Sequence, residues 1–224
     1  MSLNQKVNLL AATARNLRRL LDAGEVTSAG LVQLHLAQIA ARNLAGMKLN
    51  AIIATTPTEK VMEEAKASGN ERRTSGPRSK LHGIPTILKT PAGSSSGPAA
   101  AAAAGFAPLC IGTEADVSIV QPAIRAALYS MKCTAGAVNM AGTQSSGAAW
   151  DSAGPMAKSV EDCVDVMHIL LPGRNFRSSL KRSWQGIRIA LLNYEEWQWD
   201  DETCARASEY DDQHELSIGT NSGS

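Results

Sequence analysis

Aromatic residues and unbalanced charge are both scarce in this 224-residue sequence, and each absence excludes a class of partner. Aromatic side chains make up 4% of the chain, which leaves few platforms for stacking nucleic-acid bases. The formal net charge is +1, so the sequence offers no electrostatic attraction to nucleic acid or to an anionic membrane. Hydrophobic residues at 44% and charged residues at 19% describe a soluble globular protein. We therefore expect no nucleic-acid partner and no membrane partner.

Paired cysteines, metal-binding patterns and long apolar runs are missing as well. The four cysteines form no C-x-x-C pair, and the four histidines form no ligand pair with each other or with a cysteine. The first 12 residues carry no basic-then-apolar signal peptide. Residues 99–110 are apolar but too short to span a bilayer, which needs about 20 residues. Unpaired cysteines fit a reducing compartment, so we expect a cytoplasmic protein without a metal site.

Segments with helical periodicity alternate with short apolar runs along the chain. The pattern predicts helices at 9–23, 28–43 (capped by Thr27 or Ser28), 57–67, 99–104 (with Pro98 at its first position), from 122 and from 160. It predicts strands at 49–54, 86–89, 109–111, near 131 and at 186–192, with a solvated loop at 68–80. No internal repeat is visible. This alternation indicates an α/β layered domain.

One lysine followed by two serine sites carries the most informative chemistry. Lys89 ends a predicted strand, residues 93–97 read Gly-Ser-Ser-Ser-Gly, and Ser118 lies in residues 112–119, Gly-Thr-Glu-Ala-Asp-Val-Ser-Ile. A lysine can replace histidine as the base of a serine hydrolase if burial keeps it neutral. By itself, residues 93–97 also fit an ordinary loop with a helix cap, or an anion site at a helix N-terminus. They lack the lysine that a Walker A phosphate loop requires.

Several short motifs follow one another in an order that points to a known family. They are residues 49–52 (Leu-Asn-Ala-Ile), 81–85 (Leu-His-Gly-Ile-Pro), the strand ending at Lys89, 93–97, 112–114 (Gly-Thr-Glu), 122–123 (Pro-Ala) and 151–157 (Asp-Ser-Ala-Gly-Pro-Met-Ala). Each motif alone is weak, but in this order the chain resembles the amidase signature family from Leu9 to about Leu171. The family hydrolyses carboxylic amides. The resemblance implies a mixed β-sheet layered between helices, incomplete relative to the family.

The resemblance also implies a Ser–Ser–Lys triad and an acyl-enzyme intermediate. Ser118 would be the nucleophile, Lys89 the base, and Ser95 the bridging serine, which in this family follows a cis peptide. Backbone N–H groups of the turn before the nucleophile would stabilise the oxyanion, and by position they belong to Ala115, Asp116, Val117 and Ser118. Such a triad needs no cofactor, so none is expected.

The chain departs from the family pattern at several positions. Lys89 and Ser95 are only 6 residues apart, where the family has several tens. Val117 stands where the family has glycine, and Thr90 where it usually has an acidic residue. Residues 130–134 read Ser-Met-Lys-Cys-Thr in place of Gly-Leu-Lys-Pro-Thr, and Lys132 is expected at the surface. We expect a truncated, internally deleted chain whose strand 186–192 is left as an edge.

Three functional hypotheses follow from these features. The first is an amidase-like hydrolase, working or weakly working, that acts on a small-molecule carboxylic amide. The second is a non-catalytic amidase-like protein with a binding or scaffold role, and the third is a truncated inactive product. Residues 1–192 would form a partial amidase signature domain and residues 193–224 a polar, disordered tail. A homo-oligomer is compatible with the sequence, but no feature supports it.

Three other residues receive structural roles. His35 lies beside the apolar stripe of its predicted helix and is interpreted as a packed or half-exposed residue. His82, within the Leu-His-Gly-Ile-Pro motif, is interpreted as a packing or turn residue. Asp151 is expected to accept a backbone N–H and hold the turn at residues 154–155.

Overall fold

The computed structural model describes residues 6–89, 93–143, 147, 149–181 and 183–191, and the chain divides into two units, Met1–Lys181 and Arg182–Ser224. All helices and strands of the described residues belong to the first unit. The helices are α2 (Ala14–Asp22), α3 (Ser28–Arg42), α4 (Thr58–Ser75), α5 (Ser96–Ala103), α6 (Val120–Arg125), α7 (Val160–Leu170) and the 3₁₀ helix η1 (Phe176–Ser179). The strands are β1 (Ile87–Leu88), β2 (Leu109–Glu114), β3 (Tyr129–Ser130) and β4 (Ser152–Ala157).

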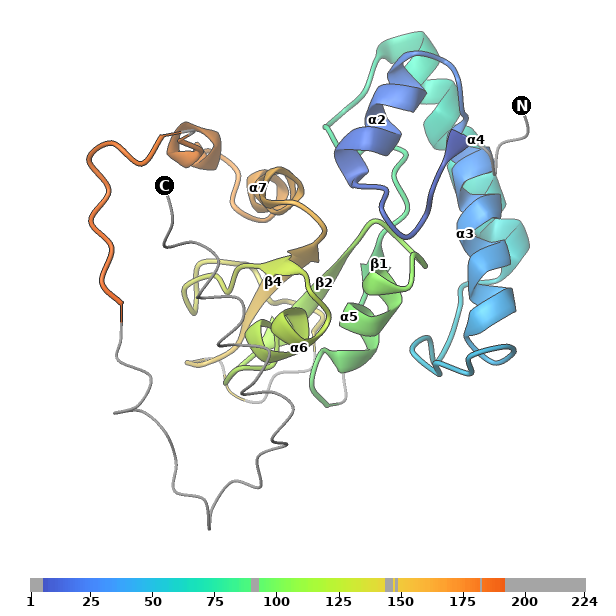
Figure 1. Ribbon diagram of the computed structural model, residues 1–224. Helices are drawn as coiled ribbons and strands as arrows, with labels where there is room; N and C mark the ends of the chain where they lie inside the picture. Colours follow the sequence, from blue (N-terminus) through green and yellow to red (C-terminus); the bar gives the residue numbers. More distant parts are fainter. Residues whose placement is uncertain (1–5, 90–92, 144–146, 148, 182, 192–224) are drawn as a thin grey trace, which may run out of the picture. The chain divides into compact units, whose positions relative to one another are not determined.

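The strands form one mixed sheet in the order β1-β2-β4-β3. β1 runs parallel to β2, whereas β2 and β3 each pair antiparallel with β4. The longest ladder joins β2 to β4, from the pair Leu109–Ala157 to the pair Glu114–Ser152. Helix α7 covers one face of the sheet, and α5 and α6 cover the other (Figure 1). The predicted mixed sheet layered between helices is therefore confirmed.

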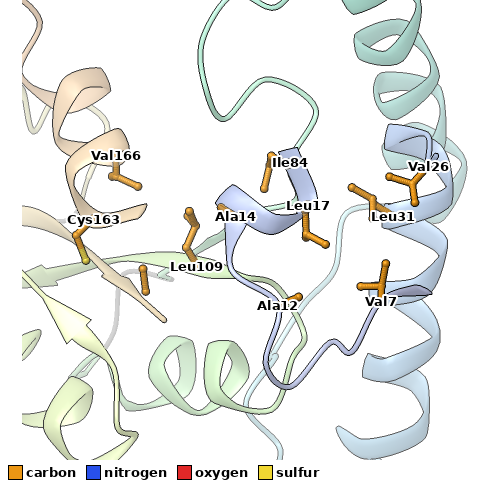
Figure 2. Close-up of a cluster of buried hydrophobic side chains, with 11 residues drawn as sticks. Val7, Ala12, Ala14, Leu17, Val26, Leu31, Ile84, Leu109, Cys163 and Val166 are labelled. Atoms are coloured by element: carbon orange, nitrogen blue, oxygen red, sulfur yellow. The ribbon is translucent and has the colours of Figure 1, made fainter. Parts of the chain in front are cut away.

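Two hydrophobic clusters on opposite faces hold these layers together. Successive side chains of a strand point to opposite faces, so neighbouring residues of β2 enter different clusters. Leu109 packs into the cluster that contains Val166 of α7, whereas Cys110 packs with Ala99 of α5. Figure 2 shows the first cluster, in which α2 and α3 also contribute buried leucines. Fully burying one such leucine stabilises the fold by roughly 1.5–3 kcal/mol.

Helix α2 begins at Ala14, five residues later than the sequence predicts, because two side chains cap it there. Thr13 accepts the N–H of Asn16 at 3.1 Å. The buried carboxylate of Asp162, from α7, accepts the N–H groups of Ala14 at 2.7 Å and Arg15 at 3.0 Å. Burial raises the pKa of Asp162, and these hydrogen bonds oppose that shift. A residue 148 positions away thus sets where α2 starts.

The strand predicted at residues 49–54 does not form, and the reason is local. The side chain of Asn43, just after α3, binds the backbone of Ile52 in both directions. Its amide donates to the Ile52 carbonyl at 2.8 Å and its oxygen accepts the Ile52 N–H at 3.0 Å. These are the groups that a strand would offer to a neighbour, so the segment is held as a loop.

Helix α4 runs to Ser75, so the loop predicted at residues 68–80 is wrong for its first eight residues. Gly69 did not stop the helix, and the strong helix formers Glu71, Arg72 and Arg73 extend it. Gly76, with a φ of +80°, ends it instead. Helix α5 likewise starts at Ser96, two residues before Pro98, which still lies in the first turn where proline costs no hydrogen bond.

Residues 183–191 form no strand, so the strand predicted at 186–192 is wrong over the described part of that segment. These residues are exposed, and an unpaired strand leaves its N–H and C=O groups without ladder partners. The predicted tail at 193–224 and the predicted boundary at residue 192 lie outside the described residues. Within the described ranges, no helix is long and apolar enough to cross a membrane.

Candidate active site

Two of the predicted site residues meet where β2 passes into α6. Residues 115–119, here called the nucleophile loop, connect these elements and contain Ser118. Ser95 is the residue that precedes α5. Its backbone N–H donates to the carbonyl oxygen of Ser118 at 3.1 Å, and the hydroxyl of Ser94 lies 3.5 Å from the same oxygen. The fold therefore brings residues 93–95, here called the serine-rich loop, into direct contact with the nucleophile loop.

The hydroxyl groups of the two serines each have a local partner. The buried Ser95 Oγ lies 3.2 Å from the Thr113 carbonyl, to which it donates, and accepts the Thr113 N–H at 3.3 Å. The Ser118 hydroxyl donates to the carbonyl of Asp116 at 3.2 Å. Because each hydroxyl carries a single proton, neither serine donates to the other in this arrangement. A proton relay between them requires one hydroxyl to rotate.

Lys89 directly follows β1, and its backbone N–H donates to the Ile111 carbonyl at 3.0 Å. Lys89 and Ser94 line the same pocket of about 380 Å³, whose other walls include Ile52, Ile53 and Leu88. Burial lowers the pKa of Lys89, and the negative charge of Asp151 opposes that shift. A lowered lysine pKa favours the neutral amine that a general base requires. Residues 90–92, which join Lys89 to the serine-rich loop, lie outside the described residues.

Asp151 is buried, and its Oδ2 accepts the N–H of Gly147 at 3.1 Å. The prediction that it accepts a backbone N–H is confirmed. The predicted turn at residues 154–155 is wrong, because both residues lie inside β4 and pair with β2. A carboxylate that influences Lys89 was not recognised in the sequence, since 62 residues separate the two.

The residues predicted to stabilise an oxyanion, Ala115, Asp116 and Val117 together with Ser118, all lie in the nucleophile loop. In the described part of the chain, the N–H groups of residues 115–118 donate to no other group, so they remain available to a ligand. Val117 has a φ of +45° and is 51% exposed. A left-handed conformation costs a non-glycine residue about 1–2 kcal/mol, and valine is branched at Cβ as well. Val117 thus adopts a left-handed backbone conformation that glycine would adopt without strain.

The resemblance implied a cis peptide before Ser95, and this expectation is wrong. No peptide bond among the described residues is cis, so the bond between Ser94 and Ser95 is trans. A cis bond between two non-proline residues costs about 2.5–4 kcal/mol, which the trans bond avoids.

The structure also tests the roles that the sequence assigned to His35, His82 and Lys132. His35 is buried and its Nδ1 lies 3.0 Å from the Gly105 carbonyl, which confirms a packed residue. His82 accepts the Arg78 N–H on Nδ1 at 3.1 Å, which confirms a turn residue. Lys132 lies at the surface, as expected. Its Nζ also donates to the carbonyl of Ala115 in the nucleophile loop at 2.7 Å. Among the described residues, no group of three or more metal-ligating side chains comes together.

Comparison with known proteins places this geometry in context. The family model named Amidase matches residues 88–210. A glutamyl-tRNA(Gln) amidotransferase subunit from Roseiflexus castenholzii is 34% identical over 117 residues, 47% of this chain and 24% of that protein. The protein of the same name from Methylococcus capsulatus is 34% identical over 141 residues, 58% of this chain and 28% of that one.

Solved structures are similar over a larger part of the chain. The peptide amidase PAM in complex with the competitive inhibitor chymostatin has 28% identity and a TM-score of 0.65, covering 74% of this chain and 49% of that one. Native peptide amidase from Stenotrophomonas maltophilia has 26% identity and a TM-score of 0.66, covering 79% and 51%. The chain therefore spans about a quarter of these curated relatives and about half of these solved chains.

Proposed function

Since the chain belongs to the amidase family, we propose that it carries the catalytic centre of a hydrolase that cleaves the C–N bond of a small-molecule carboxylic amide. The observation that carries the proposal is the hydrogen bond between the Ser95 N–H and the Ser118 carbonyl at 3.1 Å. This hydrogen bond supports the proposal because it joins the residue proposed as the bridge to the residue proposed as the nucleophile. Lys89, with a pKa lowered by burial, lies on the pocket that Ser94 also lines.

Each residue has a defined step in the reaction. The Ser118 Oγ attacks the amide carbonyl carbon, and its proton passes through the Ser95 hydroxyl to the neutral amine of Lys89. N–H groups of Ala115, Asp116, Val117 and Ser118 donate hydrogen bonds to the carbonyl oxygen and stabilise the negative charge that develops on it. The C–N bond then breaks and the amine leaves with the proton from Lys89. Water hydrolyses the resulting ester on Ser118, with Lys89 again accepting a proton, and releases the carboxylic acid.

The proposal requires no cofactor, because the serines and the lysine supply the nucleophile and the base. The partner is a small-molecule amide. The curated relatives are named as part of a larger enzyme, which supports an assembly with further chains; a homo-oligomer has no independent support in this chain. The proposed place of action is the cytoplasm.

A fluorophosphonate probe tests the nucleophile directly, because it reacts with an activated serine regardless of the natural substrate. The purified 224-residue chain, shown to be folded by circular dichroism, is incubated with the probe beside the Ser118→Ala variant. We expect labelling that maps to Ser118, is absent from Ser118→Ala, and is severely reduced in Lys89→Ala and Ser95→Ala. Absence of labelling on the folded wild-type chain would overturn the proposal.

A second candidate is a non-catalytic amidase-like protein with a binding role. The observation that favours it is the commitment of both serine hydroxyls to backbone carbonyls, Ser95 to Thr113 and Ser118 to Asp116. Failure of the probe to label a folded sample would favour this candidate. Ligand screening by thermal shift on Ser118→Ala would then be the next measurement.

A further inference from the structure

The buried carboxylate of Glu114 is hydrogen-bonded to the backbone at the end of the nucleophile loop. Glu114 ends β2 and is 5% exposed. Its Oε2 accepts the N–H of Ile119 at 2.6 Å and that of Val120 at 2.9 Å. These two donors lie on the far side of the loop, so one carboxylate joins the residue before the loop to the residues at its end. A charged acceptor makes each such hydrogen bond about twice as strong as a neutral one.

Lys132 contacts the same loop and the Glu114 carboxylate. Its Nζ donates to the Ala115 carbonyl at 2.7 Å and lies 3.7 Å from the Glu114 Oε1. The Glu114 carboxylate therefore uses one oxygen for the end of the loop and the other for the lysine. The Glu114 side chain is 5% exposed and that of Lys132 is 32% exposed, so solvent screens the pair on the lysine side only.

The backbone that carries Lys132 is itself fixed to the sheet. The N–H of Met131 donates to the carbonyl of Pro155 in β4 at 3.2 Å. The Met131 carbonyl also sits so close to Gly154 that a Cβ there would lie 1.9 Å from its oxygen. Only glycine at position 154 permits this contact. Lys132 therefore extends to the nucleophile loop from a rigid base on β4.

From this geometry we infer that Lys132 is a positioning residue, which holds the nucleophile loop in its reactive shape through Glu114 and the carbonyl of Ala115. The catalytic meaning of this inference rests on the proposed function, because the loop carries Ser118 and the proposed oxyanion donors. Lys132 acts through Glu114 and the loop backbone, and has no part in the bond-making steps. Its charge and its hydrogen bond to Ala115 are the features that matter.

Three variants of the 224-residue chain test the inference. Lys132→Met removes the charge and the donor while keeping an unbranched side chain, and Lys132→Arg keeps both the charge and a donor. Lys158→Met is the matched control, because the Lys158 Nζ also donates to a backbone carbonyl, that of Leu9 at 2.8 Å, but away from the loop. Each folded variant is measured for amide hydrogen exchange at Ile119 and Val120, and for the second-order rate of Ser118 labelling by the fluorophosphonate.

We expect Lys132→Met to exchange both amides about tenfold faster than wild type, because the Glu114 carboxylate that accepts them loses the lysine that holds its other oxygen. Its labelling rate should fall by a similar factor, while Lys132→Arg recovers most of both and Lys158→Met changes neither. Unchanged exchange in Lys132→Met would overturn the inference, as would an equal effect of Lys158→Met at the same amides.

The exchange measurement separates this inference from the proposed function. If the wild-type chain is not labelled but Lys132→Met alone loosens Ile119 and Val120, the proposed function fails and the loop-holding role stands. If the wild-type chain is labelled and Lys132→Met reduces neither exchange protection nor labelling rate, the proposed function stands and the positioning role fails.

Discussion

Gly112 in β2 passes so close to Ser95 that a Cβ at position 112 would lie 2.7 Å from the Ser95 hydroxyl oxygen. The same Cβ would lie 3.0 Å from Met156 Cε and 3.1 Å from Ile119 Cγ1. The glycine in the Gly-Thr-Glu motif therefore makes room for the hydroxyl group proposed to relay the proton. Gly112 thus lets β2 pack closely against Ser95.

Gly112→Ala should lower both stability and labelling, because the added methyl group displaces the Ser95 hydroxyl. We expect a loss of about 1–3 kcal/mol in the free energy of unfolding, the usual cost of overpacking. Urea denaturation measures this, and the fluorophosphonate rate should fall in parallel. Gly69→Ala is the matched control: it lies inside α4 with its nearest contact at 3.8 Å, and should gain about 0.5–1 kcal/mol. Equal stability of the two variants would contradict the packing argument.

Val117→Gly should speed labelling of Ser118 several-fold, because glycine adopts the left-handed φ of +45° without strain. The removal of an exposed branched side chain also opens the approach to the loop. Ala127→Gly is the control, since Ala127 has a φ of +52° beyond the other end of α6. It should relieve comparable backbone strain without changing the labelling rate. Equal acceleration in both variants, or none in Val117→Gly, would show that the conformation of Val117 does not limit the labelling rate.

Asp151→Asn should shift the pH dependence of labelling to lower pH. Burial lowers the Lys89 pKa and the Asp151 charge raises it, so removing that charge lowers the pKa further. The neutral base then forms at a lower pH. The labelling rate, measured across pH 6 to 10 as an approximate range, should rise with a midpoint below that of wild type. Glu161→Gln, a change in the first turn of α7, should leave the midpoint in place. A midpoint that moves upward in Asp151→Asn would reverse the assigned sign.

His35 should make the folded state sensitive to acid. The Gly105 carbonyl can only accept, so His35 Nδ1 carries the proton, and Nε2 is buried without a partner. Burial lowers the His35 pKa to about 4 from its ordinary value of 6.5. The unfolded chain therefore binds a proton more readily, and stability present above pH 6.5 is lost as the pH falls toward 4.

The loss from this single group between pH 7 and pH 4.5 is roughly 2 kcal/mol. Urea denaturation at the two pH values measures it, with His35→Gln as the comparison, because glutamine can donate to Gly105 but does not titrate. We expect the stability of the variant to fall less with pH than that of wild type. Parallel pH profiles would show that His35 does not contribute to acid sensitivity.

Local signals in the sequence predicted several boundaries correctly. Thr27 caps α3 and Ser159 caps α7 through hydrogen bonds to nearby N–H groups, at 3.0 Å and 3.2 Å. Such caps depend on residues only three positions apart, so the sequence alone contains the whole interaction. Where a distant group intervened, as Asp162 does at the start of α2, the predicted boundary was wrong.

The order of short motifs determined the family and the candidate residues Lys89, Ser95 and Ser118, because each motif is a local pattern that can be read without a fold. Tertiary structure alone decided how these residues are held: the fit of Gly112 against the Ser95 hydroxyl, and the hydrogen bond from Lys132 to the nucleophile loop. Those features depend on contacts between segments far apart in the sequence. The distance between two such segments cannot be read from composition or periodicity, because it is fixed only when the chain folds.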